Sequence, residues 1–288
     1  MLISTKTLLA QAQRGGYAIG AFNVYNVEGV RAVVAAAQET HSPVMLQLHP
    51  QALIYGGAPL IALCLEAAKC ATVPVAVHLD HSSSEQDIRG ALGAGLVSIM
   101  ADGSHLTYEE NISFTANMSA LAHEKNGFVE AELGRLSGTE DGLTISELEA
   151  HMTDPAKALD FISKTKVDAL AVCIGNIHGH YRNEPKLDFP RLEKIQRQVT
   201  LPLVLHGASG LPDDMIRRSI ELGVCKFNVN TEVRDAFVSS LSATLSANSK
   251  TDLLVLMQSA VDAMRQVVLQ KIFLFGSHEK AQMVLGGA

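Results

Sequence analysis

The feature that most constrains the fold is the regular alternation of short apolar runs with longer helical patterns along the chain of 288 residues. A helical pattern separates each apolar run from the next, which excludes hairpin connections and predicts a parallel sheet covered by helices. The eight runs that predict strands are 18–24, 43–49, 73–80, 96–102, 128–134, 169–175, 201–207 and 224–230.

Eight parallel strands fit a closed (β/α)8 TIM barrel, whose typical length of roughly 250 residues leaves room for extra terminal helices. The pattern at 251–275 predicts one of these terminal helices. The alternative is a doubly wound open sheet, which favours a GxGxxG turn after the first strand, and AFNVYNVEG contains none. Because no linker, low-complexity tract or charge run interrupts the pattern, we expect a single domain over residues 1–288.

Composition excludes several classes of protein. Hydrophobic residues make up 47% of the chain, which rules out bulk disorder. The net charge of −7 comes without a basic stripe, so nucleic acid is not an expected partner. No apolar run approaches the roughly 18 residues of a membrane span, and no secretory signal is evident. The cysteines form no CxxC motif and are expected to be reduced and mostly buried in a cytoplasmic protein: Cys64, Cys70, Cys173 and Cys225.

Three histidines follow predicted strands directly. His81 comes after the third strand, His178 just after the sixth, and His206 at the end of the seventh. Because the strand ends of a barrel face one mouth, these side chains should converge. Three neutral imidazoles around an open position suit a catalytic Zn²⁺.

Acidic residues gather at the same level of the predicted barrel. Asp80 precedes His81, Asp102 ends the fourth strand, and Glu130 and Glu132 share one side of the fifth by period-two alternation. Carboxylates that point into a barrel are costly unless they are paired, hydrogen-bonded or bound to metal.

Long polar segments after the fifth and sixth strands, 134–144 and 177–190, are expected to be loops at the mouth. The turns after the seventh and eighth strands, HGASG (206–210) and NVNTE (228–232), predict a phosphate site. Glycine turns and helix N-termini present backbone N–H groups to anions, and Asn230 or Thr231 is the expected N-cap of the second helix.

These motifs together resemble the class II, zinc-dependent ketose-bisphosphate aldolases, from about Ser4 to about Ala281. The family includes fructose- and tagatose-bisphosphate aldolases. The motifs that carry the resemblance are AFNVYN, VHLDHS, SIMADGSHL, VEAELGRLSGTEDG, IGNIHGHY, LVLHGASG and KFNVNTE.

The resemblance implies a role for each matching position. The zinc ligands are His81, His178 and His206, with Asp102 and Glu132 around a second or alternative metal position. Asp80 is the acid/base at the aldehyde oxygen, and Glu140 is the base at the carbon next to the ketone. The expected substrate-binding residues, beside which the family often holds Na⁺ or K⁺, are Asn23, Gly179, Gly207, Ser209, Asn228 and Thr231.

Two positions depart from the family pattern. At the end of the second strand the family usually has a small hydroxyl residue, and this chain has His49; after the eighth strand it has Asn230 where Asp or Ala is common. Both are expected to face substrate, and His49 predicts a substrate that differs from fructose 1,6-bisphosphate at the nearer end.

The implied activity is reversible retro-aldol cleavage of a phosphorylated ketose to dihydroxyacetone phosphate and an aldehyde, through a zinc-stabilised enediolate, in a homodimer or homotetramer. Alternatives are the same chemistry on another phosphorylated sugar or sugar acid, and a non-catalytic aldolase-like partner subunit. A Schiff-base aldolase would need a strand lysine, for which only Lys226 qualifies by position.

Overall fold

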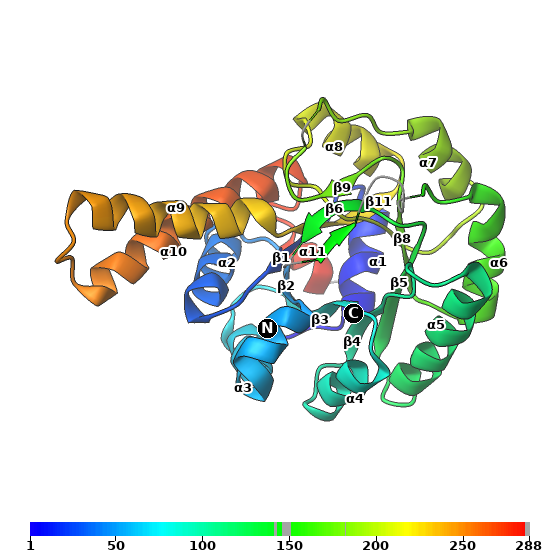
Figure 1. The fold of residues 1–288 in the computed structure, drawn as a ribbon, viewed down its shortest axis with the longest axis horizontal. Helices are drawn as coiled ribbons and strands as arrows, with labels where there is room; N and C mark the ends of the chain where they lie inside the picture. The colour runs from blue at the N-terminus through cyan, green and yellow to red at the C-terminus, as the bar shows by residue number, and fades with distance from the viewer. Residues whose placement is uncertain (141–142, 146–150, 182, 286–288) are drawn as a thin grey trace.

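The eight predicted strands close into a parallel barrel in the computed structural model (Figure 1). Their order round the barrel is β1-β11-β10-β8-β5-β4-β3-β2. This confirms the TIM-barrel prediction and excludes the open doubly wound sheet. The barrel strands are β1 (Ile19–Asn23), β2 (Val44–Leu48), β3 (Val75–Ser82), β4 (Ser98–Ala101), β5 (Phe128–Leu133), β8 (Ala169–Val172), β10 (Leu203–Leu205) and β11 (Val224–Val229).

The structure describes residues 1–140, 143–145, 151–181 and 183–285, and the side chains of 139, 140, 143–145 and 285 fall outside this description.

Helices connect the barrel strands, and most begin at a Ser, Thr, Asn or Asp whose side chain accepts a hydrogen bond from the first turn. Seven described helices lie between barrel strands: α2 (Val27–Glu39), α3 (Pro50–Cys70), α4 (Glu85–Gly93), α5 (Tyr108–His123), α6 (Pro155–Thr165), α7 (Phe189–Gln196) and α8 (Asp213–Glu221).

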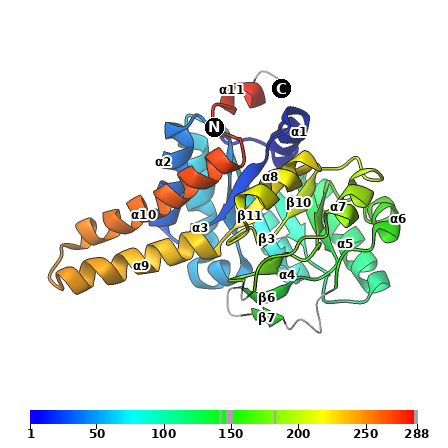
Figure 2. The same ribbon diagram turned by 90° about the horizontal axis from the view of Figure 1, so that it is seen from above.

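Extra terminal helices are also present, as predicted, and α10 matches the expected segment 251–275. Before β1 lies α1 (Thr5–Gly15), and after β11 come α9 (Thr231–Ala247), α10 (Leu253–Leu274) and α11 (Ala281–Leu285). Helices α9 and α10 pack together and project from the barrel as a long arm (Figures 1 and 2). Helices α1 and α11 lie at one end of the barrel (Figure 2).

Helix α3 corrects the expectation that no segment reaches the length of a membrane span. It has 21 residues with a best-window mean hydropathy of 1.4, and 22% of that window is buried. The helix contains Pro59 and is interrupted at Gly57, whose φ is +59°. One such helix is weak evidence for membrane contact, because core helices of soluble proteins satisfy the same criterion.

A small additional sheet lies at the end of the barrel opposite α1 and α11 (Figure 2). Its strands are β6 (Ser137–Glu140), β7 (Leu143–Ile145) and β9 (Ile177–His178), in the order β7-β6-β9. The segments 134–144 and 177–190 were expected to be loops. This expectation is wrong for part of each segment, because β6 pairs antiparallel with β7 and parallel with β9. The exclusion of hairpin connections between the barrel strands is confirmed, since neighbouring barrel strands are parallel.

The barrel interior is divided into an apolar and a polar level. Towards α1, aliphatic and aromatic side chains such as Ile19, Met45 and Phe128 pack with α1 in one buried cluster. Further along the same strands the buried interior residues are polar, among them His78, Glu130 and Lys226, each with 0% exposure. Polar groups are costly to bury without partners. The level of the barrel further from α1 is therefore where the sequence departs from simple core packing.

Candidate active site

The three histidines predicted from strand ends meet at the mouth of the barrel. A nitrogen from each of His81, His178 and His206 lies within 4.8 Å of the nitrogens of the other two. The ring centroids of His81 and His206 are 4.5 Å apart, and those of His81 and His178 are 4.9 Å apart. His178 is carried by β9 of the small sheet, so this sheet helps to build the site.

An irregularity in β3 brings two consecutive side chains into this cluster. In a regular strand Asp80 and His81 would point to opposite faces. The pairing of β3 with β4 shifts register between Leu79 and Ser82, and His81 has a φ of +39°, in the left-handed region. His81 Nε2 consequently lies 4.0 Å from Asp80 Oδ1. Bulges and strained φ angles of this kind occur preferentially next to active sites.

Asp80 is held in place from both sides by amide groups. Asn23 on β1 donates from Nδ2 to one carboxylate oxygen at 3.0 Å, and Asn228 on β11 donates to the other at 3.1 Å. Burial, the largest influence, raises the pKa of Asp80, but electrostatic interactions with His81, His206 and Lys226 together hold it well below its usual range. Asp80 is therefore an oriented anion, able to accept a proton. Gln47, which the sequence analysis missed, donates to Asn23 Oδ1 at 3.3 Å.

Asp102 and Glu132 lie beside His81 as a second cluster of potential metal ligands. One oxygen of each and a nitrogen of His81 lie within 4.8 Å of one another. Asp102 Oδ2 is 2.7 Å from His81 Nδ1 and therefore fixes the orientation of the imidazole. Burial and the negative charge of Asp102 raise the pKa of Glu132 well above its usual value. Both residues are placed where the sequence predicted.

His206 links the mouth to the polar level below it. Its Nδ1 is 2.7 Å from His81 Nε2, and its Nε2 is 2.8 Å from Glu130 Oε1. Lys226 donates to both oxygens of Glu130, at 3.0 and 2.8 Å, and its side chain is fully buried. This ion pair argues against the Schiff-base alternative, since a Schiff-base lysine needs a free amine that substrate can reach.

The histidine at position 78 was not among the residues singled out from the sequence. His78 is fully buried, and its Nδ1 lies 2.7 Å from Ser98 Oγ. Burial, followed by the charge of Lys226, lowers the pKa of His78 to about 3. Because it precedes Asp80 by two residues on the same strand, period-two alternation was the signal that could have placed it inside the barrel.

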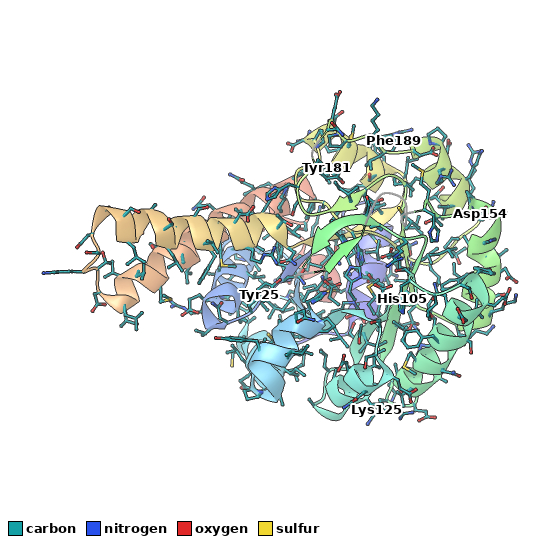
Figure 3. The ribbon with its side chains drawn as sticks, in the orientation of Figure 1. Tyr25, His105, Lys125, Asp154, Tyr181 and Phe189 are labelled. Atoms are coloured by element: carbon teal, nitrogen blue, oxygen red, sulfur yellow. The ribbon has the colours of Figure 1, made fainter. Side chains whose placement is uncertain are left out.

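The expected anion site lies where β10 and β11 end. Helix α9 begins at Thr231 with Asn230 as N-cap, but the Asn230 side chain makes no capping hydrogen bond. Its Oδ1 instead accepts from the hydroxyl of Tyr25, 2.8 Å away, a residue that follows β1 (Figure 3). Ser209 Oγ accepts from the backbone N–H of Glu232 at 3.4 Å. Ser209, Asn230 and Thr231 therefore lie together at the N-terminus of α9.

Gly207 has a steric role as well as its expected place in this site. Its φ is +64°, and a Cβ there would lie 2.0 Å from the carbonyl oxygen of Ile177. Tyr181 joins the same two segments, because its hydroxyl accepts from Ile177 N and donates to Gly207 O, both at 3.1 Å (Figure 3). The turn after β10 is thus pressed against the strand that carries His178. Gly179 follows His178 with a φ of +82°.

His49 lies at the mouth, as the sequence analysis expected. Its exposure is 4%, and its ring centroid is 6.3 Å from that of His81. Its Nδ1 also accepts from the backbone N–H of Gln51 at 3.2 Å, which makes His49 the N-cap of α3. The predicted base Glu140 ends β6, but its side chain lies outside the described residues.

Comparison with known proteins points to one family. The model of the family "Fructose-bisphosphate aldolase class-II" matches residues 3–280. The structure is similar to the YdjI aldolase of Escherichia coli K12, with 35% identity and a TM-score of 0.86 over 98% of this chain and 100% of that one.

Two further structures are similar. A protein from Coccidioides immitis assigned as a fructose-1,6-bisphosphate aldolase has 33% identity and a TM-score of 0.91, over 97% of this chain and 98% of its own. The fructose-bisphosphate aldolase of Campylobacter jejuni has 22% identity and a TM-score of 0.77, over 97% of each chain, and supports the fold alone.

Proposed function

The chain belongs to the class II fructose-bisphosphate aldolase family, whose members are metal-dependent lyases, and on that premise we propose that it cleaves a phosphorylated ketose reversibly to dihydroxyacetone phosphate and an aldehyde. The observation that carries the proposal is the convergence of three imidazoles beside an oriented carboxylate, Asp80. The family and this cluster together support a carbon–carbon lyase.

The donor set fits a divalent cation, and Zn²⁺ in particular. His81, His178 and His206 offer three nitrogens within one ligand sphere, a set that leaves a position open for substrate. The three histidines would hold the ion, with Asp102 and Glu132 as the second set beside His81. When bound, the cation supplies a Lewis acid for the ketone carbonyl of the substrate.

Asp80 is the residue we assign to the proton on the cleaved side of the substrate. Its carboxylate takes the proton of the hydroxyl that becomes the aldehyde oxygen, while the adjacent carbon–carbon bond breaks and its electron pair stays with the ketone half. The amide hydrogen bonds from Asn23 and Asn228 keep both carboxylate oxygens oriented for this transfer. In the synthetic direction Asp80 returns the proton.

On the basis of its sequence motif, we assign Glu140 to the second proton transfer. It delivers a proton to the carbon that has gained the electron pair, which completes dihydroxyacetone phosphate, and removes the same proton in the reverse reaction. Its place at the end of β6, in the segment after β5, supports a position above the mouth.

The phosphate of the ketone half is assigned to the turns after β10 and β11. Backbone N–H groups near Gly207, Ser209 and Thr231 and the N-terminal end of α9 favour an anion there. Gly179, Asn228 and Asn230 complete the proposed contacts, and Na⁺ or K⁺ is the proposed neighbouring cation. Binding energy gained at this remote group supports catalysis at the reacting carbons.

The substrate end nearest His49 is the part of the substrate that the family alone does not identify. The buried imidazole of His49 near His81 favours an end that accepts a hydrogen bond, so another phosphorylated sugar or a sugar-acid phosphate is the second candidate. The test is a retro-aldol assay on a panel of ketose 1-phosphates and 1,6-bisphosphates that measures release of dihydroxyacetone phosphate. Release from at least one member supports the proposal. No release from any member by the metal-loaded protein would favour the non-catalytic subunit.

A further inference from the structure

A buried ion pair lies directly behind His206, on the side away from the mouth. Glu130 from β5 receives three hydrogen bonds: two from Lys226 Nζ on β11, at 3.0 and 2.8 Å, and one involving His206 Nε2, at 2.8 Å. All three side chains have exposures of 1% or less. The proposed mechanism assigns no role to either charged residue.

The hydrogen-bond chemistry of this group fixes which nitrogen of His206 faces the mouth. A carboxylate only accepts hydrogen bonds, so the imidazole must carry its hydrogen on Nε2 when it bonds to Glu130. The lone pair is then on Nδ1, the atom that lies 2.7 Å from His81 Nε2. Metal-binding histidines usually have their other nitrogen held by an acceptor in this way.

Lys226 supplies the positive charge that compensates the buried carboxylate of Glu130. A buried carboxylate that faces only a neutral imidazole lacks a compensating charge, which is strongly unfavourable. Because Lys226 bonds to both oxygens, it also prevents the carboxylate from turning away from His206. The carboxylate plane, and through it the ring plane of His206, is therefore set by Lys226.

Stability is a weak explanation for this pair. Apolar side chains fill the neighbouring level of the same barrel, including Val204 two residues before His206. Replacement of a buried ion pair by neutral groups is often harmless or stabilising in other proteins. An ion pair at this depth is better explained by the group it orients.

We propose that Lys226 and Glu130 are positioning residues for the metal centre, which orient His206 so that Nδ1 faces the ion. The inference rests on the proposed role of His206 as a metal ligand. It adds a function for two residues that touch neither the metal position nor the substrate.

The test is the double variant Lys226→Met/Glu130→Gln, which removes both charges and leaves no unpaired ion. A glutamine at position 130 can present either its oxygen or its amide nitrogen to His206, so the ring loses its fixed partner. The dissociation constant for Co²⁺, measured by chelator competition, should rise about 10- to 100-fold. The visible absorption bands of bound Co²⁺ should also shift, while thermal unfolding stays cooperative.

Ser98→Ala is the matched control, since Ser98 is a buried polar residue of the same barrel that bonds to His78 and Thr5 but not to His206. It should leave Co²⁺ affinity and spectrum unchanged. A folded double variant with wild-type affinity and spectrum would overturn this inference and leave the proposed function standing. Wild-type protein that binds no Co²⁺ would contradict the proposed function itself.

A measurement on the wild type keeps the inference testable even if the double variant does not fold. Long-range ¹H–¹⁵N correlation spectra of the metal-free protein report which ring nitrogen of each histidine carries the hydrogen. His206 should carry it on Nε2. A hydrogen on Nδ1 would show that Glu130 and Lys226 do not set the ring as proposed.

Discussion

Asp80 and His81 are consecutive in β3, yet His81 Nε2 lies 4.0 Å from Asp80 Oδ1. The φ of +39° at His81 and the register shift beside it make this possible. A regular strand would send one of the two side chains into the surrounding helices. The irregular backbone therefore places a proposed proton acceptor and a proposed metal ligand together, from adjacent positions in the sequence.

Glu140→Ala should lower turnover by roughly 10²- to 10⁴-fold, the usual contribution of one catalytic proton transfer. Metal content should not change, because the proposed ligands are all elsewhere. Asp141→Ala, at the neighbouring acidic position, is the control and should keep most activity. Steady-state kinetics with metal analysis checks both variants, and near-normal turnover in Glu140→Ala would mean that another group is the base.

Gly207→Ala should damage the metal site through packing. The new Cβ would lie 2.0 Å from Ile177 O, next to the proposed ligand His178, so β9 must move. Gly210→Ala is a matched control, because its φ is +81° but the nearest atom to its Cβ is 3.5 Å away. Strain from the left-handed backbone alone costs about 1–2 kcal/mol. Chelator competition should therefore show weaker metal binding in Gly207→Ala than in Gly210→Ala, and equal affinities would refute this role.

His49→Ser should change substrate preference while it preserves the fold, since serine is a good N-cap for α3. An imidazole next to an anionic group adds a hydrogen bond worth roughly 1.5–3 kcal/mol and occupies space that a second phosphate would use. We expect poor wild-type cleavage of fructose and tagatose bisphosphates, improved by about tenfold or more in the variant. Efficient wild-type cleavage that the substitution leaves unaffected would contradict the prediction.

His78 should make the metal-free protein less stable as the pH falls. Burial lowers its pKa from 6.5 to about 3 in the folded state, so between these values the unfolded chain binds the extra proton. The free energy of unfolding then decreases with falling pH, by up to about 1.4 kcal/mol per pH unit for one proton. Urea unfolding at several pH values should show a shallower dependence in His78→Gln, and identical slopes would count against the pKa shift.

The barrel was predictable from the sequence because its strands are short, apolar and separated by helices. Strands β6, β7 and β9 were not, since they have two to four residues and lie in glycine-rich or polar segments. The first part of helix α3 was not predictable either, because Gly57 and Pro59 interrupt its helical periodicity. Short strands and kinked helices depend on tertiary contacts that local pattern does not encode.

The site was predictable to the extent that its residues end strands. His81, His178 and His206 follow this rule, and the structure brings them together. Lys226 and Glu130 lie deeper, and the sequence showed their positions but not that they pair. Their partnership depends on register across the barrel between β5 and β11, which do not neighbour each other.

Titration of Zn²⁺ into chelator-treated protein tests the central claim most directly. Release of dihydroxyacetone phosphate from a cleavable ketose phosphate is followed as the metal is added. The account predicts no activity without metal, a rise to a plateau at about one equivalent per chain, and no rise in His178→Ala. Full activity in the metal-free wild type would contradict it.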